Sequence, residues 1–228
     1  MSNRPKRVNP RPSRLQPRQQ QQDRSRRTRV LIWGALGLLV AVAVVIGVAV
    51  ADSSSGGDGV ETGFAETLGD PLPPDDDTDD AVGLLAPSFR AQTTQNTDVV
   101  DVITDDGTVR AIGFFTHWCS HCRAEVPRVS KWLADNDVPA GVELVAVSTS
   151  VDAGAPNYPP SAWFEREDWP GDVLSDSDQD TIATAYGLAN FPYWVLVDGD
   201  GLVVERFTGE LTEAEFTAFM DRAEAAVA

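Results

Sequence analysis

The chain has 228 residues and a formal net charge of −17, and its charges are segregated along the sequence. Residues 1–29 carry a net charge of +9, residues 30–51 carry none, residues 52–80 carry −10 and residues 81–228 carry −16. This division excludes a simple cytosolic globular protein. It also argues against a nucleic-acid-binding domain, because an acidic surface repels phosphates. The last segment is long enough for one domain with a buried core.

The first 51 residues are predicted to be a basic tail followed by a membrane anchor. Residues 1–29 have few apolar side chains, so they are expected to be disordered. As a helix, residues 30–51 would be about 33 Å long, enough to cross the hydrocarbon core of a lipid bilayer. The positive-inside rule then places the tail in the cytoplasm and residues 52–228 outside it. A cleavable secretory signal ending in Ala-Val-Ala is the alternative, but the apolar run is long for one.

Residues 52–80 are predicted to be an acidic, flexible linker. The segment begins with Ser and Gly and continues with Asp and Pro, and repulsion between its like charges should extend it. A calcium-binding tract is the alternative, although the Asp run lacks the loop geometry of such sites. The acidic run at residues 176–180 also lacks the Gly and Glu of a calcium loop, and it is interpreted as the start of a helix. We therefore expect no metal site.

Residues 81–228 are predicted to form an α/β domain with a mixed sheet and helices on both faces, because strand and helix patterns alternate along them. The central strands should be buried on both faces, since their runs are almost continuously apolar. The predicted strands are residues 109–115, 142–147, 193–197 and 202–207, and the predicted helices follow residue 119, lie at 161–168 and 181–188, and begin at the capping box of Thr212 and Glu215.

The two cysteines of the chain, Cys119 and Cys122, lie between a predicted strand and a predicted helix. A helix N-terminus stabilises a thiolate, so Cys119 is predicted to be the attacking sulfur and Cys122, one turn later, the resolving one. A zinc half-site is one alternative, but tetrahedral closure by two Cys and two His within residues 117–122 would be strained. A structural disulfide closing so short a loop would add little stability. The pair is therefore predicted to be redox-active without a cofactor.

The segment around the cysteines resembles the active site of thioredoxin-fold proteins, and more narrowly the membrane-anchored TlpA/ResA type of thiol–disulfide oxidoreductase. Glu and Pro follow the second Cys with the spacing of that branch, and a Phe-Pro pair precedes a strand and an Asp-Gly-Asp-Gly turn. The resemblance covers residues 81–228. It is carried by Ala86-Pro87-Ser88-Phe89, Trp118, Cys119, Cys122, Glu125, Pro127, Phe191 and Pro192.

The resemblance implies that Glu125 exchanges protons with Cys122 and that Pro192 follows a cis peptide bond beside the cysteines. Trp118, Phe191 and Pro192 would then form the surface that binds substrate. It further implies protein thiols or disulfides as substrates and a membrane redox partner. Reduction, for example of apocytochrome c cysteines, and oxidation of secreted proteins both remain open.

Three positions, Gly113, Tyr193 and His121, depart from the pattern of this group. Gly113 occupies the position where thioredoxins proper carry a buried Asp, so proton handling is expected to fall to Glu125 or to water. Tyr193 stands where Thr commonly follows the cis-proline, and it is expected to narrow the substrate groove. A charged His121 would stabilise the Cys119 thiolate and make the disulfide more oxidising than that of thioredoxin. His117 is assigned only a polar role at the surface.

Two other functions remain as alternatives. A thiol peroxidase of the peroxiredoxin type is suggested by Thr116-x-x-Cys119, although Ile112 stands where that pattern requires Pro. A copper-binding chaperone would use the two cysteines and a nearby His. The copper-handling relatives of this fold have a wider Cys spacing and a distant downstream His, whereas no His follows His121 here.

Overall fold

A computed structural model describes residues 61–76, 80–95 and 98–227 of the chain. The expected tail and membrane helix, residues 1–29 and 30–51, lie outside the described residues. None of the helices in the described ranges has the length and apolar character that a membrane crossing requires.

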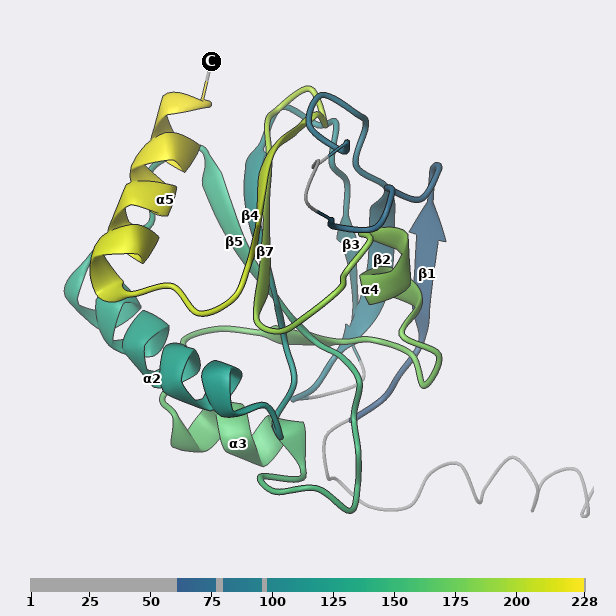
Figure 1. Ribbon diagram of the computed structural model, residues 1–228, viewed down its shortest axis with the longest axis vertical. Helices are drawn as coiled ribbons and strands as arrows, with labels where there is room; N and C mark the ends of the chain where they lie inside the picture. The colour runs from purple at the N-terminus through teal and green to yellow at the C-terminus, as the bar shows by residue number, and fades with distance from the viewer. Residues whose placement is uncertain (1–60, 77–79, 96–97, 228) are drawn as a thin grey trace, which may run out of the picture. The chain divides into compact units, whose positions relative to one another are not determined.

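The strands of the described part of the chain form a single eight-stranded sheet, and from β4 onward helices connect or follow most of the strands (Figure 1). In chain order the elements are β1 (Ala65–Leu68), β2 (Ser88–Thr93), β3 (Val99–Val102), β4 (Val109–Phe115), α2 (Ser120–Asp135), β5 (Val142–Ser148), α3 (Pro160–Arg166), β6 (Val173–Ser175), α4 (Thr181–Ala185), β7 (Tyr193–Val197), β8 (Val203–Thr208) and α5 (Glu213–Ala225). The strand order is β1-β2-β6-β5-β4-β7-β8, and β3 pairs with β2 outside this path.

The centre of the sheet is β4, which runs parallel to β5 and antiparallel to β7. Successive residues of β4 and β7 point to opposite faces, and both faces are covered, so every residue of these two strands is buried. Helices α2, α3 and α5 lie on one face, and α4 lies on the other beside the N-terminal strands (Figure 1). The predicted mixed sheet with helices on both faces is confirmed.

The core on the face covered by α2, α3 and α5 is called the helix-side core. It is rich in aromatic rings that meet edge to face, an arrangement that adds to the free energy gained by burying them. Its buried aromatic members are Phe115, Trp132, Trp163, Phe164, Trp169, Trp194, Phe216 and Phe219.

The structure differs from the expected flexible linker over residues 61–76. Strand β1 pairs with β2 in an antiparallel register that places Ala65 opposite Ala91. Further along, Leu72 is 4% exposed, and its N–H donates a hydrogen bond to the carbonyl of Ala185 at 2.8 Å. The average acidity of the segment obscured these few apolar residues, which pack against the second face of the sheet.

The acidic run before α4 has a structural role. Both carboxylate oxygens of the buried Asp176 accept hydrogen bonds from the first turn of the helix, at 2.9 Å from the Ile182 N–H and 3.0 Å from the Ala183 N–H. These bonds satisfy helix N–H groups that would otherwise lack partners. Among the described residues, no group of three or more His, Cys, Asp or Glu side chains is arranged to hold a metal ion.

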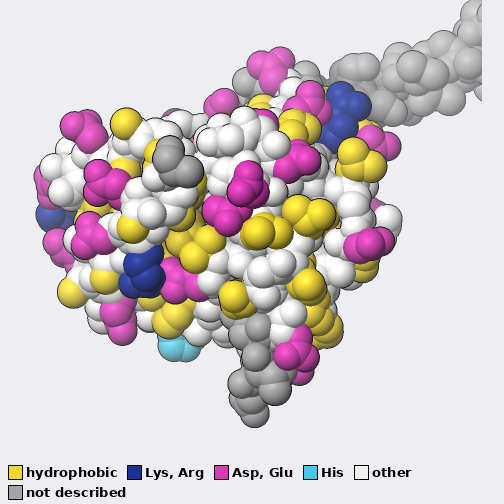
Figure 2. All heavy atoms as spheres, turned by 90° about the horizontal axis from the view of Figure 1, so that it is seen from above, with side chains coloured by type: hydrophobic (Ala, Val, Ile, Leu, Met, Phe, Trp, Pro, Cys, Tyr) yellow, Lys and Arg dark blue, Asp and Glu magenta, His cyan; other side chains and the backbone are white. Residues whose placement is uncertain are grey.

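Acidic side chains are spread over the surface of the domain. Figure 2 shows Asp and Glu scattered across one face, with few Lys or Arg among them. The described part of the chain thus carries the negative field expected from its composition, which disfavours strongly acidic partners.

Replacing Leu72 by Ala tests whether residues 61–76 belong to the folded domain. We expect Leu72→Ala to lower the free energy of unfolding by about 2–4 kcal/mol, because it leaves a cavity between the N-terminal segment and the sheet. The matched control is Leu68→Ala, since Leu68 lies in the same segment but is 77% exposed. It should change the free energy by less than about 0.5 kcal/mol. Equal effects in equilibrium urea unfolding would contradict the assignment.

Candidate active site

The cysteine pair lies at the junction of β4 and α2. Strand β4 ends at Phe115, and Cys119 is the N-cap residue of α2, with extended backbone dihedrals. The Cys119 N–H donates to the carbonyl of Thr116 at 3.2 Å, and its own carbonyl accepts from the N–H of Arg123 at 3.1 Å. This tight turn places the first sulfur at the positive end of the helix dipole, as the sequence predicted.

The two thiols are free and differ in exposure. Cys119 is partly exposed, whereas Cys122, one turn further along α2, is completely buried. Burial raises the pKa of the Cys122 thiol, and the charges of Cys119 and Glu125 add to that effect. A molecule from solvent therefore meets the sulfur of Cys119 first, which agrees with the predicted order of attack.

Phe191 and Pro192 lie beside Cys119. The peptide bond between them is cis, as the resemblance implied. The Cys119 thiol donates a hydrogen bond to the carbonyl of Phe191, with Sγ and O 3.8 Å apart. The ring of Phe191 meets that of Trp118 nearly at right angles, with 6.0 Å between centroids. The three residues predicted to bind substrate therefore lie together at Cys119: Phe191 contacts the thiol, and Trp118 and Pro192 adjoin Phe191.

The orientation of Trp118 depends on the loop after β5, which sequence reasoning did not include in the site. The 40%-exposed indole donates its Nε1–H to the carbonyl of Ser150 at 2.8 Å. Ser150 has a left-handed backbone, with φ of 50°. Asp180 holds it in place by accepting from its N–H at 2.7 Å and from its hydroxyl at 2.8 Å. No local motif marks these residues; the parallel pairing of β5 with β4 and with β6 brings them together.

Glu125 is buried on the same side of α2 as Cys122. Its Oε1 accepts a hydrogen bond from the indole N–H of Trp194 at 2.8 Å. Its Oε2 is also buried and has no hydrogen-bond partner of normal geometry among the described residues. Burial raises the pKa of Glu125 to about 7, against the opposing effect of the Trp194 hydrogen bond. A carboxyl with this pKa can both accept and donate a proton near neutral pH.

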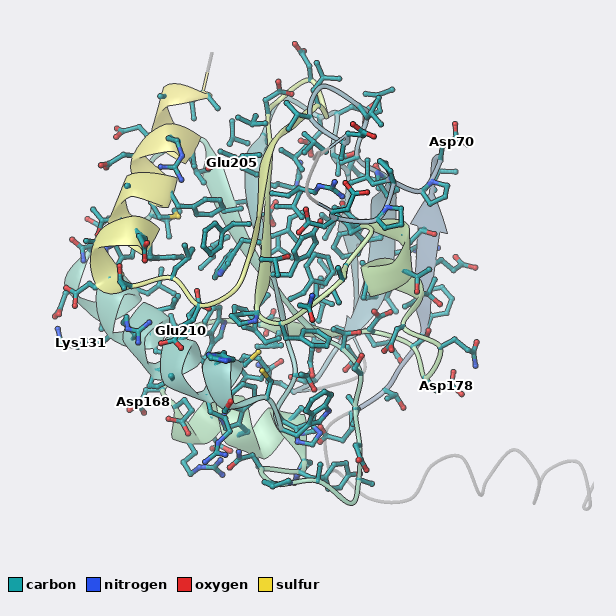
Figure 3. All side chains as sticks on the ribbon, in the orientation of Figure 1. Asp70, Lys131, Asp168, Asp178, Glu205 and Glu210 are labelled. Carbon is teal, nitrogen blue, oxygen red and sulfur yellow. The ribbon has the colours of Figure 1, made fainter. Side chains whose placement is uncertain are left out.

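His121, the residue predicted to tune the thiolate, is exposed and faces away from the core. Its Nδ1 lies 3.2 Å from Oε2 of Glu210, and Arg128 binds the other oxygen of Glu210 at 2.7 Å. Arg128 and, after it, His121 hold the pKa of Glu210 below its usual range. Figure 3 shows Glu210 beside α2. The effect of His121 on Cys119 stays a prediction, because the recorded contact of its ring is with Glu210.

Two expectations about neighbouring residues were wrong. His117 is buried rather than at the surface: its Nδ1 donates to the carbonyl of Pro156 at 2.7 Å, and its Nε2 accepts from the N–H of Asp152 at 3.2 Å. Tyr193 is also buried and donates its hydroxyl to the carbonyl of Tyr186 at 3.0 Å. It points into the core on the α4 face, since it lies on the side of β7 opposite to Trp194, so it does not narrow the groove.

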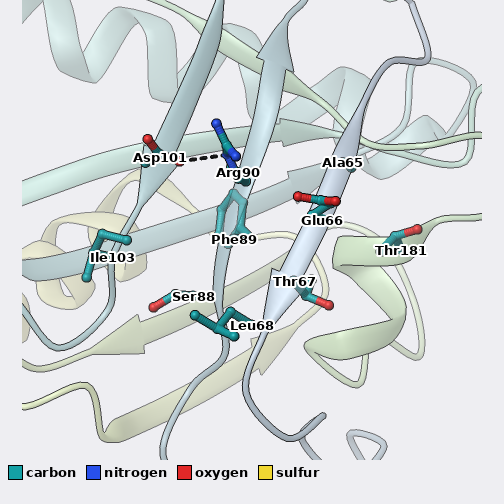
Figure 4. A pocket seen from close by; sticks show the side chains of 10 residues that line it. All are labelled: Ala65, Glu66, Thr67, Leu68, Ser88, Phe89, Arg90, Asp101, Ile103 and Thr181. Carbon is teal, nitrogen blue, oxygen red and sulfur yellow. Dashed lines mark ion pairs between the residues drawn. The ribbon is translucent and has the colours of Figure 1, made fainter.

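A separate hollow of about 620 Å³ lies on the N-terminal strands (Figure 4). It is lined by residues of β1 and β2, by Asp101 and Ile103, and by Thr181, and the ion pair between Arg90 and Asp101 crosses it at 2.9 Å. No residue of the cysteine segment lines it. The hollow is therefore not part of the candidate active site.

The protonation of Glu125 predicts a pH-dependent stability. The folded chain holds this proton up to a pKa of about 7, whereas the unfolded chain releases it near the ordinary value of 4.5, so stability falls as pH rises between these values. Glu125→Gln does not ionise and should escape this loss. Its advantage in free energy of unfolding over the wild type should grow by about 2.5 kcal/mol from pH 5 to pH 8.

Urea unfolding of the reduced proteins at both pH values provides the measurement. Glu224→Gln, on the exposed face of α5, controls for the change from carboxyl to amide. An advantage of the same size at both pH values would show that Glu125 is ionised throughout.

Comparisons with known proteins agree with this geometry. Residues 82–206 match the AhpC/TSA family. The thiol-disulfide oxidoreductase ResA of Bacillus thuringiensis is 28% identical over 111 residues, covering 49% of this chain and 61% of that protein. The thiol:disulfide interchange protein HelX of Rhodobacter capsulatus is 27% identical over 116 residues, covering 51% and 61%. The chain thus spans about 61% of the length of these relatives.

Solved structures show the same fold. The crystal structure of a putative thiol:disulfide interchange protein DsbE from Chlorobium tepidum superposes with a TM-score of 0.53 at 23% identity, covering 64% of this chain and 98% of that one. A thioredoxin family protein from Chlorobium tepidum TLS gives a TM-score of 0.50 at 21% identity, covering 64% and 99%. From the matched segment and this shared architecture, the chain belongs to the AhpC/TSA family and has a thioredoxin-like fold.

Proposed function

We propose that the protein is a thiol–disulfide oxidoreductase that acts on protein disulfides or dithiols through Cys119 and Cys122. The observation that carries this proposal is the unequal exposure of two free thiols one helical turn apart, with the exposed one beside the Phe191–Pro192 backbone. Glu125, with its pKa near 7, supplies a proton acceptor next to the buried thiol. The names of ResA and HelX, thiol-disulfide oxidoreductase and thiol:disulfide interchange protein, support the same activity.

In the reductive direction the reaction has two steps. The Cys119 thiolate attacks one sulfur of a substrate disulfide, which forms a mixed disulfide and releases the other substrate sulfur as a thiolate. Cys122 then passes its proton to the Glu125 carboxylate and attacks the Cys119 sulfur. This step closes the Cys119–Cys122 disulfide and releases the second substrate thiolate. The substrate gains two electrons, and a dithiol donor must return two electrons to the protein.

The partly exposed surface around Cys119 is suited to an extended peptide. Pro192 has no backbone N–H, and the adjoining rings of Trp118 and Phe191 offer an apolar surface near Cys119. The carbonyl of Phe191 would be shared between the resting Cys119 thiol and a substrate backbone N–H. The same steps run in reverse oxidise a substrate dithiol, and the reduction potential of the partner determines the direction.

We further propose that residues 30–51 anchor the protein in a lipid bilayer and that the redox domain lies outside the cytoplasm. The charge pattern of the first 80 residues supports this topology. In this setting the substrates are thiols or disulfides of secreted proteins or of apocytochrome c, and a membrane dithiol protein supplies or accepts the electrons. Residues 1–29 keep their proposed assignment as a cytoplasmic tail. The proposed linker is shortened from residues 52–80 to residues 52–60, and the proposed redox domain begins at residue 61 rather than 81, because β1 pairs with β2.

The two alternative functions find little support in the geometry. Ile112 is buried in the middle of β4, where a peroxiredoxin pattern would need Pro, and the Thr116 hydroxyl donates to the Ser150 carbonyl rather than facing Cys119. A copper site would need an imidazole near the two thiols. His117 is engaged with the loop after β5, and His121 with Glu210.

Trapping of a mixed disulfide tests the proposed function. We expect Cys122→Ser to lose turnover in reduction of a model protein disulfide and to accumulate an adduct with the substrate that dithiothreitol releases. Cys119→Ser should lose turnover without forming an adduct, because the remaining thiol, Cys122, is buried. Ser120→Ala, an exposed substitution between the cysteines, should keep wild-type activity. Non-reducing electrophoresis and mass spectrometry identify the adduct, and normal turnover by Cys122→Ser would refute the mechanism.

A further inference from the structure

Trp194 and Gly113 lie opposite each other on adjacent strands of the sheet. The two residues are paired in the register between β7 and β4. A Cβ atom at Gly113 would come within 2.7 Å of Cζ3 and 2.8 Å of Cη2 of the Trp194 ring. The indole therefore occupies the space that any larger residue at Gly113 would need, and the absence of a side chain there allows this placement.

Three further aromatic rings pack against the indole and restrict its position. Its centroid lies 5.3 Å from that of Phe115, 5.3 Å from that of Phe216 and 5.6 Å from that of Phe219. Trp194 is fully buried. In such a closely packed environment a side chain does not change rotamer without displacing its neighbours. The direction of its N–H is therefore set by the helix-side core.

That N–H points at Glu125, whose Oε1 lies 2.8 Å away. The bond is charge-assisted when the carboxyl is ionised, and such bonds are stronger than neutral ones. The other groups that act on Glu125 come from α2 and from the segment before α5. Arg128 and the backbone N–H of Leu211 favour the charged form, whereas Glu210 opposes it.

We propose that Trp194 is a positioning residue for the dithiol chemistry, and that its N–H holds the Glu125 carboxyl beside Cys122 and favours the ionised form that accepts the Cys122 proton. This inference rests on the proposed function. Gly113 belongs to the same arrangement, because it determines where the indole lies. Loss of the N–H leaves the buried carboxylate without this hydrogen bond, so the carboxyl should retain its proton to higher pH.

Trp194→Phe in the full-length protein removes the donor and keeps an aromatic ring. The pKa of Glu125 can be followed by its carboxyl infrared band, assigned with Glu125→Gln. We expect this pKa to rise by about one pH unit, a tenfold gain in proton affinity, as for loss of a hydrogen bond to a charged group.

A single-turnover reaction reports the chemical consequence. Reaction of Cys119 with dithiobis(nitrobenzoate) forms a mixed disulfide and releases one thionitrobenzoate. Attack by Cys122 on the Cys119 sulfur then closes the protein disulfide and releases the second, with the Cys122 proton passing to Glu125. The midpoint in the pH profile of this second release should move upward with the pKa of Glu125 in Trp194→Phe, and it should be absent in Glu125→Gln.

Trp132→Phe is the matched control. Trp132 also lies in the helix-side core, and its N–H donates to the hydroxyl of Thr217 at 2.9 Å rather than to Glu125. It should leave both readouts unchanged. Gly113→Ala provides a second test, because it keeps the N–H but displaces the indole, and it should shift both readouts in the same direction as Trp194→Phe. If Trp194→Phe does not fold, Gly113→Ala alone tests the proposal.

An unchanged pKa of Glu125 in a folded variant would overturn the proposal, as would an equal shift in Trp132→Phe. A shifted pKa with an unchanged profile for the second release would also overturn it. Neither readout uses a protein substrate. A chain that failed to reduce protein disulfides would therefore refute the proposed function without affecting the result for Trp194.

Discussion

The packing of α2 across β4 and β7 is the constraint on which the rest of the structure depends. It places one side of a helix N-terminus at the surface and the other in an aromatic core, so two sulfurs in one short motif meet different surroundings. The exposed sulfur can meet a partner, and the buried one is kept as a neutral thiol until a base acts on it. The same packing takes Glu125 out of water and brings its pKa to the range where that base is useful.

The central part of this fold could be predicted from local patterns. Strands β4, β5 and β7 are largely apolar because most of their residues are buried on both faces of the sheet. The capping box of Thr212 and Glu215 marked the start of α5. The strands β1, β2, β3 and β6 carried weaker signals. The exposed faces of β1, β2 and β3 hold charged residues such as Glu66 and Arg90, so the sequence there resembles a loop. Strand β6 is buried but has only three residues.

The residues of the candidate site likewise divide into those that the local sequence predicts and those that it does not. Cys119, Cys122 and Glu125 lie on one helix, so their spacing was sufficient to group them, and the cis bond before Pro192 followed from the resemblance. Ser150, with Asp180 behind it, and Trp194 were missed because they reach the site from other strands and loops. His117 and Tyr193 were misjudged for a related reason: whether a polar ring is buried depends on neighbours distant in sequence.

Strand β7 shows how closely the two cores of the domain are linked. Tyr193 faces the core on the α4 side, and Trp194 faces the helix-side core. Because side chains alternate along a strand, a shift of one residue exchanges the two faces. A single insertion between Pro192 and Tyr193 would place a phenol beneath the cysteines and an indole among the N-terminal strands. The site is thus sensitive to the length of the chain here as well as to the identity of its residues, and deletions or insertions in β7 should be far less tolerated than substitutions on its neighbour β8.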